Sequence, residues 1–251
     1  MEVRALPALS DNYIYLLLDG DKAAVVDPGV PDVVIEALEA EGRGLDLILN
    51  THHHGDHIAG NEALKARYGA YLIGPAAEAG RISGMDRQVA AGDSVEFAGR
   101  TASVIETPGH TTGHIAFHFA SEAALFCGDT LFSLGCGRMF EGSPQQFWDS
   151  LKKLRALPEE TQVYCGHEYT ASNARFAVSI DPDNTALAER SNDVERLRAA
   201  GQPTIPSRLG EEIAANPFLR ADDPGLQAAL GLSGQDPVTV FADIRSRKDR
   251  F

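Results

Sequence analysis

The stretch THHHGDHIAGN, residues 51–61, crowds His52, His53, His54, Asp56 and His57 into six positions, directly after the apolar run LDLILN. An apolar run of this kind predicts a buried strand. His52 and His54 are two residues apart, so in an extended chain they point to the same side, while His53 points away. Asp56 and His57 face another direction. The spacing therefore predicts two pairs of ligands, which favours a site for two metal ions.

Three further apolar runs deliver a possible ligand at their carboxyl ends. ASVIETPG is followed by His110, AALFCG by Asp129 and TQVYCG by His167. In α/β proteins, ligands bind in the loops at the carboxyl ends of strands. Imidazoles and carboxylates suit zinc, iron or manganese, and a carboxylate such as Asp129 can bridge two ions. Structural zinc sites usually contain cysteines, and none lies here, so the set favours a catalytic site with open positions.

The alternative to metal binding is that the histidines are structural. We expect this role for His53, His114 and His118, and most clearly for His118, which lies within a strand pattern. Asp27, at the end of KAAVVDPG, has two interpretations that the sequence leaves open. It either orients a ligand histidine from behind or serves as a turn residue before Pro28.

Composition limits the classes of function. The 36 acidic and 22 basic residues give a net charge of −14, which disfavours binding to nucleic acid. No apolar run approaches the roughly 20 residues of a membrane helix, and the first residues lack the pattern of a signal peptide. Three cysteines without a CxxC pair suit a reducing compartment. We therefore expect a cytoplasmic monomer that binds neither nucleic acid nor membranes.

Short β-rich runs alternate with helical patterns up to about residue 172, which predicts an α/β domain over residues 1–172. Expected helices in this part are PDVVIEALEAEG, HIAGNEALKARYG and SPQQFWDSLKKLRALP, the last with a capping box at Ser143 and Gln146. After residue 172 the strand signals stop. Residues 173–251 read as helices separated by prolines, so we expect a small helical domain there.

The complete pattern resembles the metallo-β-lactamase superfamily, on the strength of THHHGDH, the lone His110, Asp129 in GDT and His167 in CGHE. That resemblance implies an αββα sandwich with a two-metal site at one edge of its sheets. Narrower motifs are similar to those of hydroxyacylglutathione hydrolases, also called glyoxalase II. These motifs are LPALSDNYIYLL at 6–17, CGRMFEG at 136–142, CGHEYT at 165–170, NPFLR at 216–220 and the terminal RSRKDRF.

The resemblance implies a role for each candidate ligand. The first metal would be held by His52, His54 and His110, and the second by Asp56, His57 and His167. Asp129 would bridge the two ions. This division agrees with the two pairs predicted from the spacing. The expected cofactors are two divalent ions per chain, zinc first, with iron and manganese as alternatives.

The activity implied is hydrolysis of S-2-hydroxyacylglutathione, chiefly S-D-lactoylglutathione, to glutathione and D-lactate, as in methylglyoxal detoxification. We expect the ions to lower the pKa of a shared water, so that hydroxide attacks the thioester carbonyl and a metal stabilises the oxyanion. Asp56 is also expected to orient the hydroxide. No side-chain nucleophile is needed, so we interpret Cys136 as a small loop residue.

Glutathione carries two carboxylates, so an acidic protein needs local cations to hold it. Arg245 and Lys248 lie three apart in the last predicted helix, which opens at Asp236 and Pro237, and hence on one face. The resemblance places further contacts at 138–140 and Tyr169. A basic helix end that merely suits the helix dipole is the alternative.

Two positions in the predicted contact loop differ from the family. Arg138 stands where the family often has Lys, which keeps the charge. Phe140 stands where it often has Tyr, so a hydroxyl that could bond glutathione is missing. We expect a higher KM than in Tyr-bearing relatives, and a Phe140→Tyr variant should lower it.

The nearest rival function is a glutathione persulfide dioxygenase of the same superfamily, with one iron and without the long helical C-terminal domain. The motifs NPFLR and RSRKDRF argue against it. Lactonase and β-lactamase functions leave the basic last helix unexplained. A two-metal nuclease conflicts with the charge of −14. A non-enzymatic metal-binding protein is also disfavoured, because the open coordination positions of the metals would then have no function.

Overall fold

The apolar runs of the first 128 residues form strands in the computed structural model, which describes residues 1–251 throughout. The first sheet has the order β1-β2-β3-β4-β5-β6, antiparallel from β1 to β3 and parallel from β3 to β6. Its strands are β1 (Glu2–Ala8), β2 (Asn12–Asp19), β3 (Lys22–Val26), β4 (Leu47–Leu49), β5 (Tyr71–Pro75) and β6 (Arg87–Val89). Parallel pairing buries β3, β4 and β5 on both faces, which explains their continuous apolar sequences.

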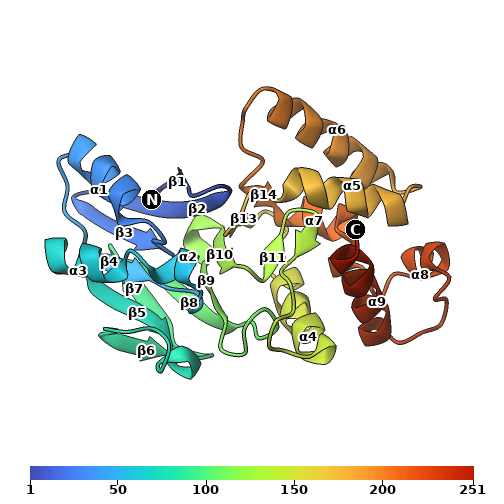
Figure 1. Cartoon of the computed structure of the whole chain (residues 1–251), viewed down its shortest axis with the longest axis horizontal. Helices are drawn as coiled ribbons and strands as arrows, with labels where there is room; N and C mark the ends of the chain where they lie inside the picture. Colours follow the sequence, from blue (N-terminus) through green and yellow to red (C-terminus); the bar gives the residue numbers. More distant parts are fainter. The chain divides into compact units, whose positions relative to one another are not determined.

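Helices α1 (Pro31–Ala40) and α3 (Asn61–Tyr68) lie on one side of this sheet (Figure 1). Val34 and Leu38 of α1 and Leu64 of α3 pack with Val25 and Ile48 of the strands in one buried cluster. The apolar face of each helix thus covers the sheet that its own strand–helix–strand connection creates.

A second set of strands forms an antiparallel meander in the order β7-β8-β9-β10. Its members are β7 (Ser94–Phe97), β8 (Arg100–Glu106), β9 (Ile115–Phe119) and β10 (Ala124–Gly128). Phe126 of β10 contacts Phe119, with ring centroids 6.1 Å apart, and Tyr15 of β2, at 5.6 Å. These aromatic contacts join the meander to the first sheet through a shared core.

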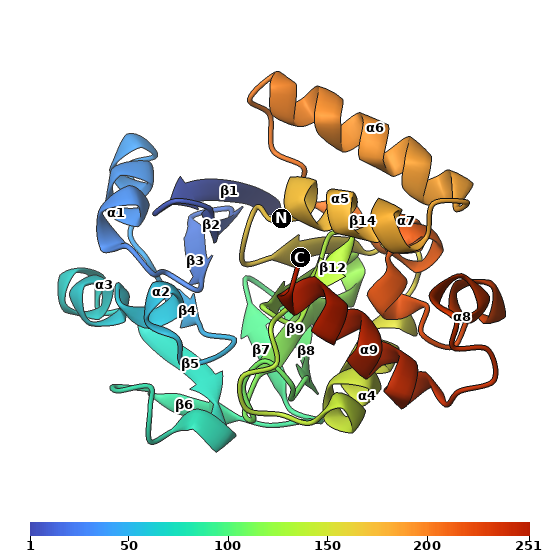
Figure 2. The same cartoon turned by 45° about the vertical axis from the view of Figure 1, so that its right-hand side comes forward.

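The remaining elements form a second compact unit that is mainly helical. It contains β11 (Leu131–Phe132), β12 (Gly135–Cys136), α4 (Pro144–Arg155), β13 (Gln162–Cys165), α5 (Thr170–Ile180), α6 (Thr185–Ala199), β14 (Ser207–Arg208), α7 (Leu209–Ala215), α8 (Pro224–Leu230) and α9 (Pro237–Asp249). Figure 2 shows α6 beside α5 and α9 beside α4. The core between α4 and α9 is aromatic, with Phe241 in contact with Phe147, Trp148 and Phe218.

The boundary between the two compact units does not lie at residue 172, where the sequence predicted it. One unit holds 1–106 and 113–128, and the other holds 107–112 and 129–251. Residues 129–172 group with the helices because β12 contacts α5 and α4 contacts α9. Packing therefore ties this segment to the C-terminal helices, although its sequence pattern continues that of the preceding strands.

Several local predictions were wrong in detail. The short strands β6, β7, β11, β12 and β14 were not predicted. The helix expected at 57–69 is divided into α2 (Gly55–Ile58) and α3. It breaks at Gly60, whose amide donates to the carbonyl of Pro28 (2.8 Å). The capping box at Ser143 and the Asp236 cap of α9 are confirmed.

None of the helices has the length and apolar character needed to cross a membrane.

Side chains from the C-terminal helices hold the backbone of residues 132–137, which we call the hairpin loop. Asn216 donates to the carbonyls of Phe132 (3.0 Å) and Gly135 (2.9 Å). Glu212 accepts from the amide of Leu134 (2.7 Å), and Asn173 donates to the carbonyl of Ser133 (3.1 Å). These buried side chains add to the β11–β12 pairing and bind backbone groups of the loop, so they fix its shape.

We predict that Asn216→Ala lowers the free energy of unfolding by about 2–4 kcal/mol, because it leaves two buried carbonyls unsatisfied. Urea denaturation measures this change. Gln145→Ala, which removes an exposed bond to Asp149 on α4, is the control and should cost about 0.5 kcal/mol or less. Equal effects of the two substitutions would contradict a structural role for Asn216.

Candidate metal centre

Asp27, at the carboxyl end of β3, organises the histidine-rich stretch of the first unit. Its Oδ1 accepts from the amide of Thr51 (2.8 Å). Its Oδ2 accepts from the Thr51 hydroxyl (2.6 Å) and lies 3.0 Å from Nδ1 of His57. All three residues are buried. Asp27 therefore both ends its strand, with a positive φ of 52°, and orients a histidine.

These bonds decide which ring nitrogens carry protons. The Thr51 hydroxyl donates to Asp27, so its oxygen is left to accept from Nδ1 of His52, 3.0 Å away. His57 likewise donates from Nδ1 to the Asp27 carboxylate. Both rings then present a bare Nε2, which is the form that binds a metal. One carboxylate thus sets two tautomers, one directly and one through a hydroxyl.

The structure brings the ligands of this stretch together in the two pairs that the spacing predicts. Nε2 of His52 lies 3.1 Å from Nδ1 of His54, and Nε2 of His57 lies 3.6 Å from Oδ2 of Asp56. Two ligands of one tetrahedral ion, each about 2.0–2.1 Å from it, are separated by roughly 3.3 Å. Asn12 donates to the same Oδ2 of Asp56 (2.9 Å), which orients the carboxylate.

A close approach of two loops supports this arrangement. A side chain at Gly29 would place its Cβ 1.8 Å from the carbonyl oxygen of Asp56. Only glycine lets the turn that follows Asp27 pack against α2 at this distance. The turn after β3 and the histidine-rich segment after β4 are thus packed in one fixed arrangement.

The second unit carries the other three predicted ligands. Nε2 of His110 and Nε2 of His167 each lie 3.4 Å from Oδ2 of Asp129. His110 donates from Nδ1 to the carbonyl of Arg138 (2.8 Å), and a carbonyl can only accept, so Nε2 of this ring is also bare. Asp129 therefore lies between two imidazoles, a position compatible with the bridging role predicted for it.

The remaining histidines are held by protein groups. His53 lies 2.9 Å from the buried carboxylate of Glu78 and 3.1 Å from a guanidinium nitrogen of Arg81. His114 is buried and stacks on His52, with ring centroids 4.7 Å apart. His118 is buried in β9, and that burial lowers its pKa. These contacts support the structural roles expected for all three.

The predicted substrate residues differ in exposure. Arg138, Phe140 and Tyr169 are exposed, and Lys248 is half-buried. The Phe140 ring contacts His110, and the Tyr169 ring stacks on His167 at 4.7 Å. These two aromatic side chains therefore lie against His110 and His167, two of the predicted ligands.

Arg245, by contrast, is only 5% exposed. It donates to the carbonyl of Cys136 (2.9 Å) and pairs with Asp249 (2.9 Å). The placement makes Arg245 a further support of the hairpin loop. Cys136 is itself buried, and that burial raises the pKa of its thiol to about 11, which disfavours the nucleophilic thiolate.

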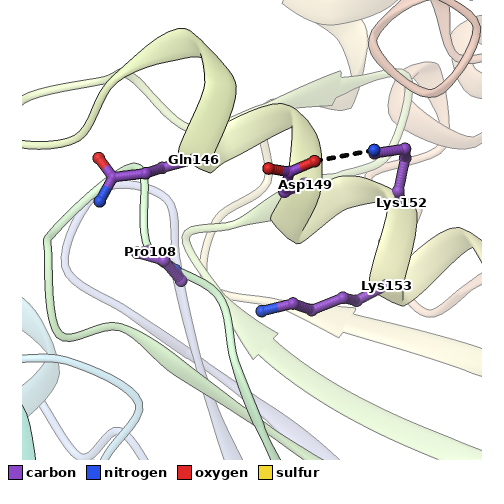
Figure 3. Close-up of a pocket in the computed structure, with 5 residues that line it drawn as sticks. All are labelled: Pro108, Gln146, Asp149, Lys152 and Lys153. Carbon is purple, nitrogen blue, oxygen red and sulfur yellow. Dashed lines mark ion pairs between the residues drawn. The ribbon is translucent and has the colours of Figure 1, made fainter.

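A separate pocket on α4 has a different chemistry. It is lined by Pro108, Gln146, Asp149, Lys152 and Lys153, and the close-up shows Asp149 paired with Lys152 at 2.8 Å (Figure 3). It contains none of the predicted ligands. Its only carboxylate is already paired with a lysine, so we do not assign a metal to it.

Two family models match consecutive parts of the chain. The metallo-β-lactamase superfamily matches residues 9–167, and the hydroxyacylglutathione hydrolase C-terminus matches residues 168–251. The hydroxyacylglutathione hydrolase of Rhodospirillum rubrum is 54% identical, over 100% of this chain and 99% of its own length. That of a Synechococcus strain is 55% identical over the full length of both.

The chain belongs to the hydroxyacylglutathione hydrolase family. The fold agrees with that membership, since a crystal structure of ETHE1 from Myxococcus xanthus matches with a TM-score of 0.70 at 28% identity, covering 98% of this chain and 90% of that one. Within this metallo-β-lactamase fold, clustered imidazoles and carboxylates with bare Nε2 atoms are suited to divalent metal ions.

Some residues of the centre were not predicted from the sequence. Thr51 and Asn12 carry no ligand signal of their own, yet they orient His52 and Asp56. The carbonyl of Arg138 that holds His110 is a backbone group and cannot be recognised from residue type. The only available signal was position, since Thr51 directly precedes the histidine run.

We predict that Asp27→Ala weakens metal binding about 10–100-fold, because two histidines lose their orientation together. Thr51→Val keeps the shape but removes only the link to His52, so it should weaken one of the two bound ions more than the other. Competition with a chromophoric chelator measures both effects. Asp21→Ala, on an exposed turn, is the control, and equal affinities in all variants would contradict the tautomer argument.

Proposed function

We propose that this chain hydrolyses thioesters of glutathione, S-D-lactoylglutathione above all, to glutathione and a 2-hydroxy acid such as D-lactate. The observation that carries the proposal is the set of histidines with fixed tautomers beside carboxylates, in a chain that matches a hydroxyacylglutathione hydrolase over its whole length. In such a role the enzyme would take part in removing methylglyoxal. Support comes from the ligands and from the C-terminal family match.

The proposed ligands are His52, His54 and His110 for one divalent ion and Asp56, His57 and His167 for another, with Asp129 shared between them. Zinc suits this donor set best, and iron or manganese also suit it. When bound, such ions lower the pKa of water and polarise a carbonyl. Asn12 would keep Asp56 aimed at the attacking water, which supports a catalytic role for Asp56 beside that of Asp129.

The chain's other residues would bind and orient the thioester. Arg138 and Lys248 supply positive charge for the carboxylates of glutathione, and Tyr169 and Phe140 supply aromatic faces beside the ligand histidines. Arg245 would affect substrate binding indirectly, because it holds the hairpin loop that leads to Arg138. Hydrolysis transfers the acyl group to water and releases a thiolate, which needs little acid assistance because a thiol pKa is only about 8.5.

The persulfide dioxygenase is less well supported. The curated relatives that match at 50–55% identity over nearly the whole chain carry the name hydroxyacylglutathione hydrolase. The terminal segment 168–251 matches the model of the hydrolase C-terminus. We further propose that the enzyme acts as a cytoplasmic monomer and binds neither nucleic acid nor membranes, in line with its net charge of −14.

The direct test is loss of thioester absorbance from S-D-lactoylglutathione, before and after removal of metal by a chelator. The metal-loaded chain should hydrolyse the substrate, and chelation should abolish the activity until zinc is restored. No hydrolysis by a metal-loaded protein would contradict the proposal. Oxygen consumption with glutathione persulfide would then test the rival function.

Lys248 gives the substrate affinity a predicted pH dependence. Burial, together with three guanidinium groups, lowers its pKa from 10.5 to about 8, and those groups belong to Arg245, Arg175 and Arg138. Asp249, the nearby acid, acts in the opposite direction. Only the protonated ammonium attracts a carboxylate, so this attraction is present below pH 8 and is lost as the pH rises through 8.

We therefore predict that KM rises about 3–10-fold between pH 7 and 9.5, in initial rates measured over this range. Lys248→Arg keeps its charge throughout, so its KM should stay nearly constant. A rise of equal size in both proteins would assign the pH dependence to another group.

A further inference from the structure

The segment that carries His110 lies between two strands of the first unit but groups with the second unit. Strand β8 ends at Glu106 and β9 begins at Ile115, and residues 107–112, which we call the His110 loop, lie outside both strands. These six residues belong to the compact unit that holds 129–251. Bonds other than strand pairing must therefore set the position of His110.

The first part of the His110 loop is bound by two elements of the second unit. Ser150 of α4 donates to the carbonyl of Pro108 (2.8 Å), and the amide of Gly142 donates to the carbonyl of Gly109 (3.1 Å). A side chain at Gly142 would place its Cβ 2.6 Å from the Cα of Gly109. Only glycine permits this approach of the two backbones, so the residue before His110 is fixed against the segment 138–142.

Glu141 binds the other end of the same loop. Its Oε2 accepts from the amide (2.8 Å) and from the hydroxyl (3.1 Å) of Thr112. His110 itself donates from Nδ1 to the carbonyl of Arg138, in the same segment (2.8 Å). The segment 138–142 thus meets the His110 loop at three points, before, at and after the histidine.

The strength of these bonds decides how much Glu141 can contribute. Glu141 is exposed, so water competes for each of its bonds, and a single neutral bond there would contribute little. Both donors of Thr112, however, converge on one charged oxygen, and bonds to a charged acceptor are the stronger kind. A metal ligand must be held to within about 0.5 Å of its place, so even a small shift of a backbone two residues away affects the ring.

We propose that Glu141 is a positioning residue for His110, and that it acts through Thr112 and not through contact with a metal ion. The inference rests on the proposed function, in which His110 is a ligand, and it adds a residue to that function. Both partners of the carboxylate are donors, so the role requires an acceptor oxygen at this place and not a negative charge. An amide carbonyl at position 141 should therefore perform it.

The first test measures metal affinity by competition with a chromophoric chelator. Glu141→Ala should weaken one of the two bound ions about 10-fold and leave the other nearly unchanged. Glu141→Gln keeps the acceptor oxygen and should recover most of the affinity. Glu195→Ala, which removes an exposed glutamate of α6 in the same unit, is the matched control and should bind both ions as the wild type does.

The second test uses the metal-free chain, so that it depends on neither metal nor turnover. Hydrogen exchange followed by mass spectrometry should be about 5-fold faster over residues 107–112 in Glu141→Ala than in Glu195→Ala, and equal over α6. Equal exchange in the two variants, equal metal affinity in the two variants, or no recovery in Glu141→Gln would each overturn the inference. If the metal-loaded wild type hydrolyses no thioester, the proposed function fails, and the exchange and affinity measurements still decide the role of Glu141.

Discussion

The Asp27 carboxylate is the group on which the first half of the centre depends. It accepts hydrogen bonds from the amide and hydroxyl of Thr51 and from His57, and all of these groups are buried. A buried carboxylate that lost these donors would incur a large desolvation cost, so the arrangement is rigid. Because Thr51 passes the effect on to His52, a single acid determines which nitrogen each of two imidazoles offers to a metal.

In the second unit the backbone of the hairpin loop has a comparable role. Asn173, Asn216 and Arg245 come from different parts of the C-terminal region, yet each donates to a carbonyl between residues 132 and 136. Arg138 follows this loop, and its carbonyl holds His110. The helices that the family model assigns to the hydrolase C-terminus therefore stabilise the segment whose carbonyl holds His110, a predicted metal ligand.

The sequence predicted those parts of the molecule that follow from spacing and residue type. Alternation predicted that His52 and His54 lie on one side, and their ring nitrogens are 3.1 Å apart. The apolar runs predicted β4, β10 and β13. It failed where long-range contacts decide the structure. β14 is a strand only because Ser207 and Arg208 pair with β13, and Arg245 shares a helical face with Lys248 but is buried under the hairpin loop. Lys248 of α9 contacts Ser172 and Phe176 only because α5 and α9 pack together.

We propose above that His52, His54, Asp56, His57, His110, Asp129 and His167 hold two metal ions for thioester hydrolysis. A crystal structure of the metal-loaded protein, with anomalous scattering at the absorption edge of the bound metal, tests it most directly. We predict two anomalous peaks about 3.5–4 Å apart, with Asp129 between them and both His54 and His167 as ligands. A single peak, or two peaks held by the residues of one unit alone, would contradict it.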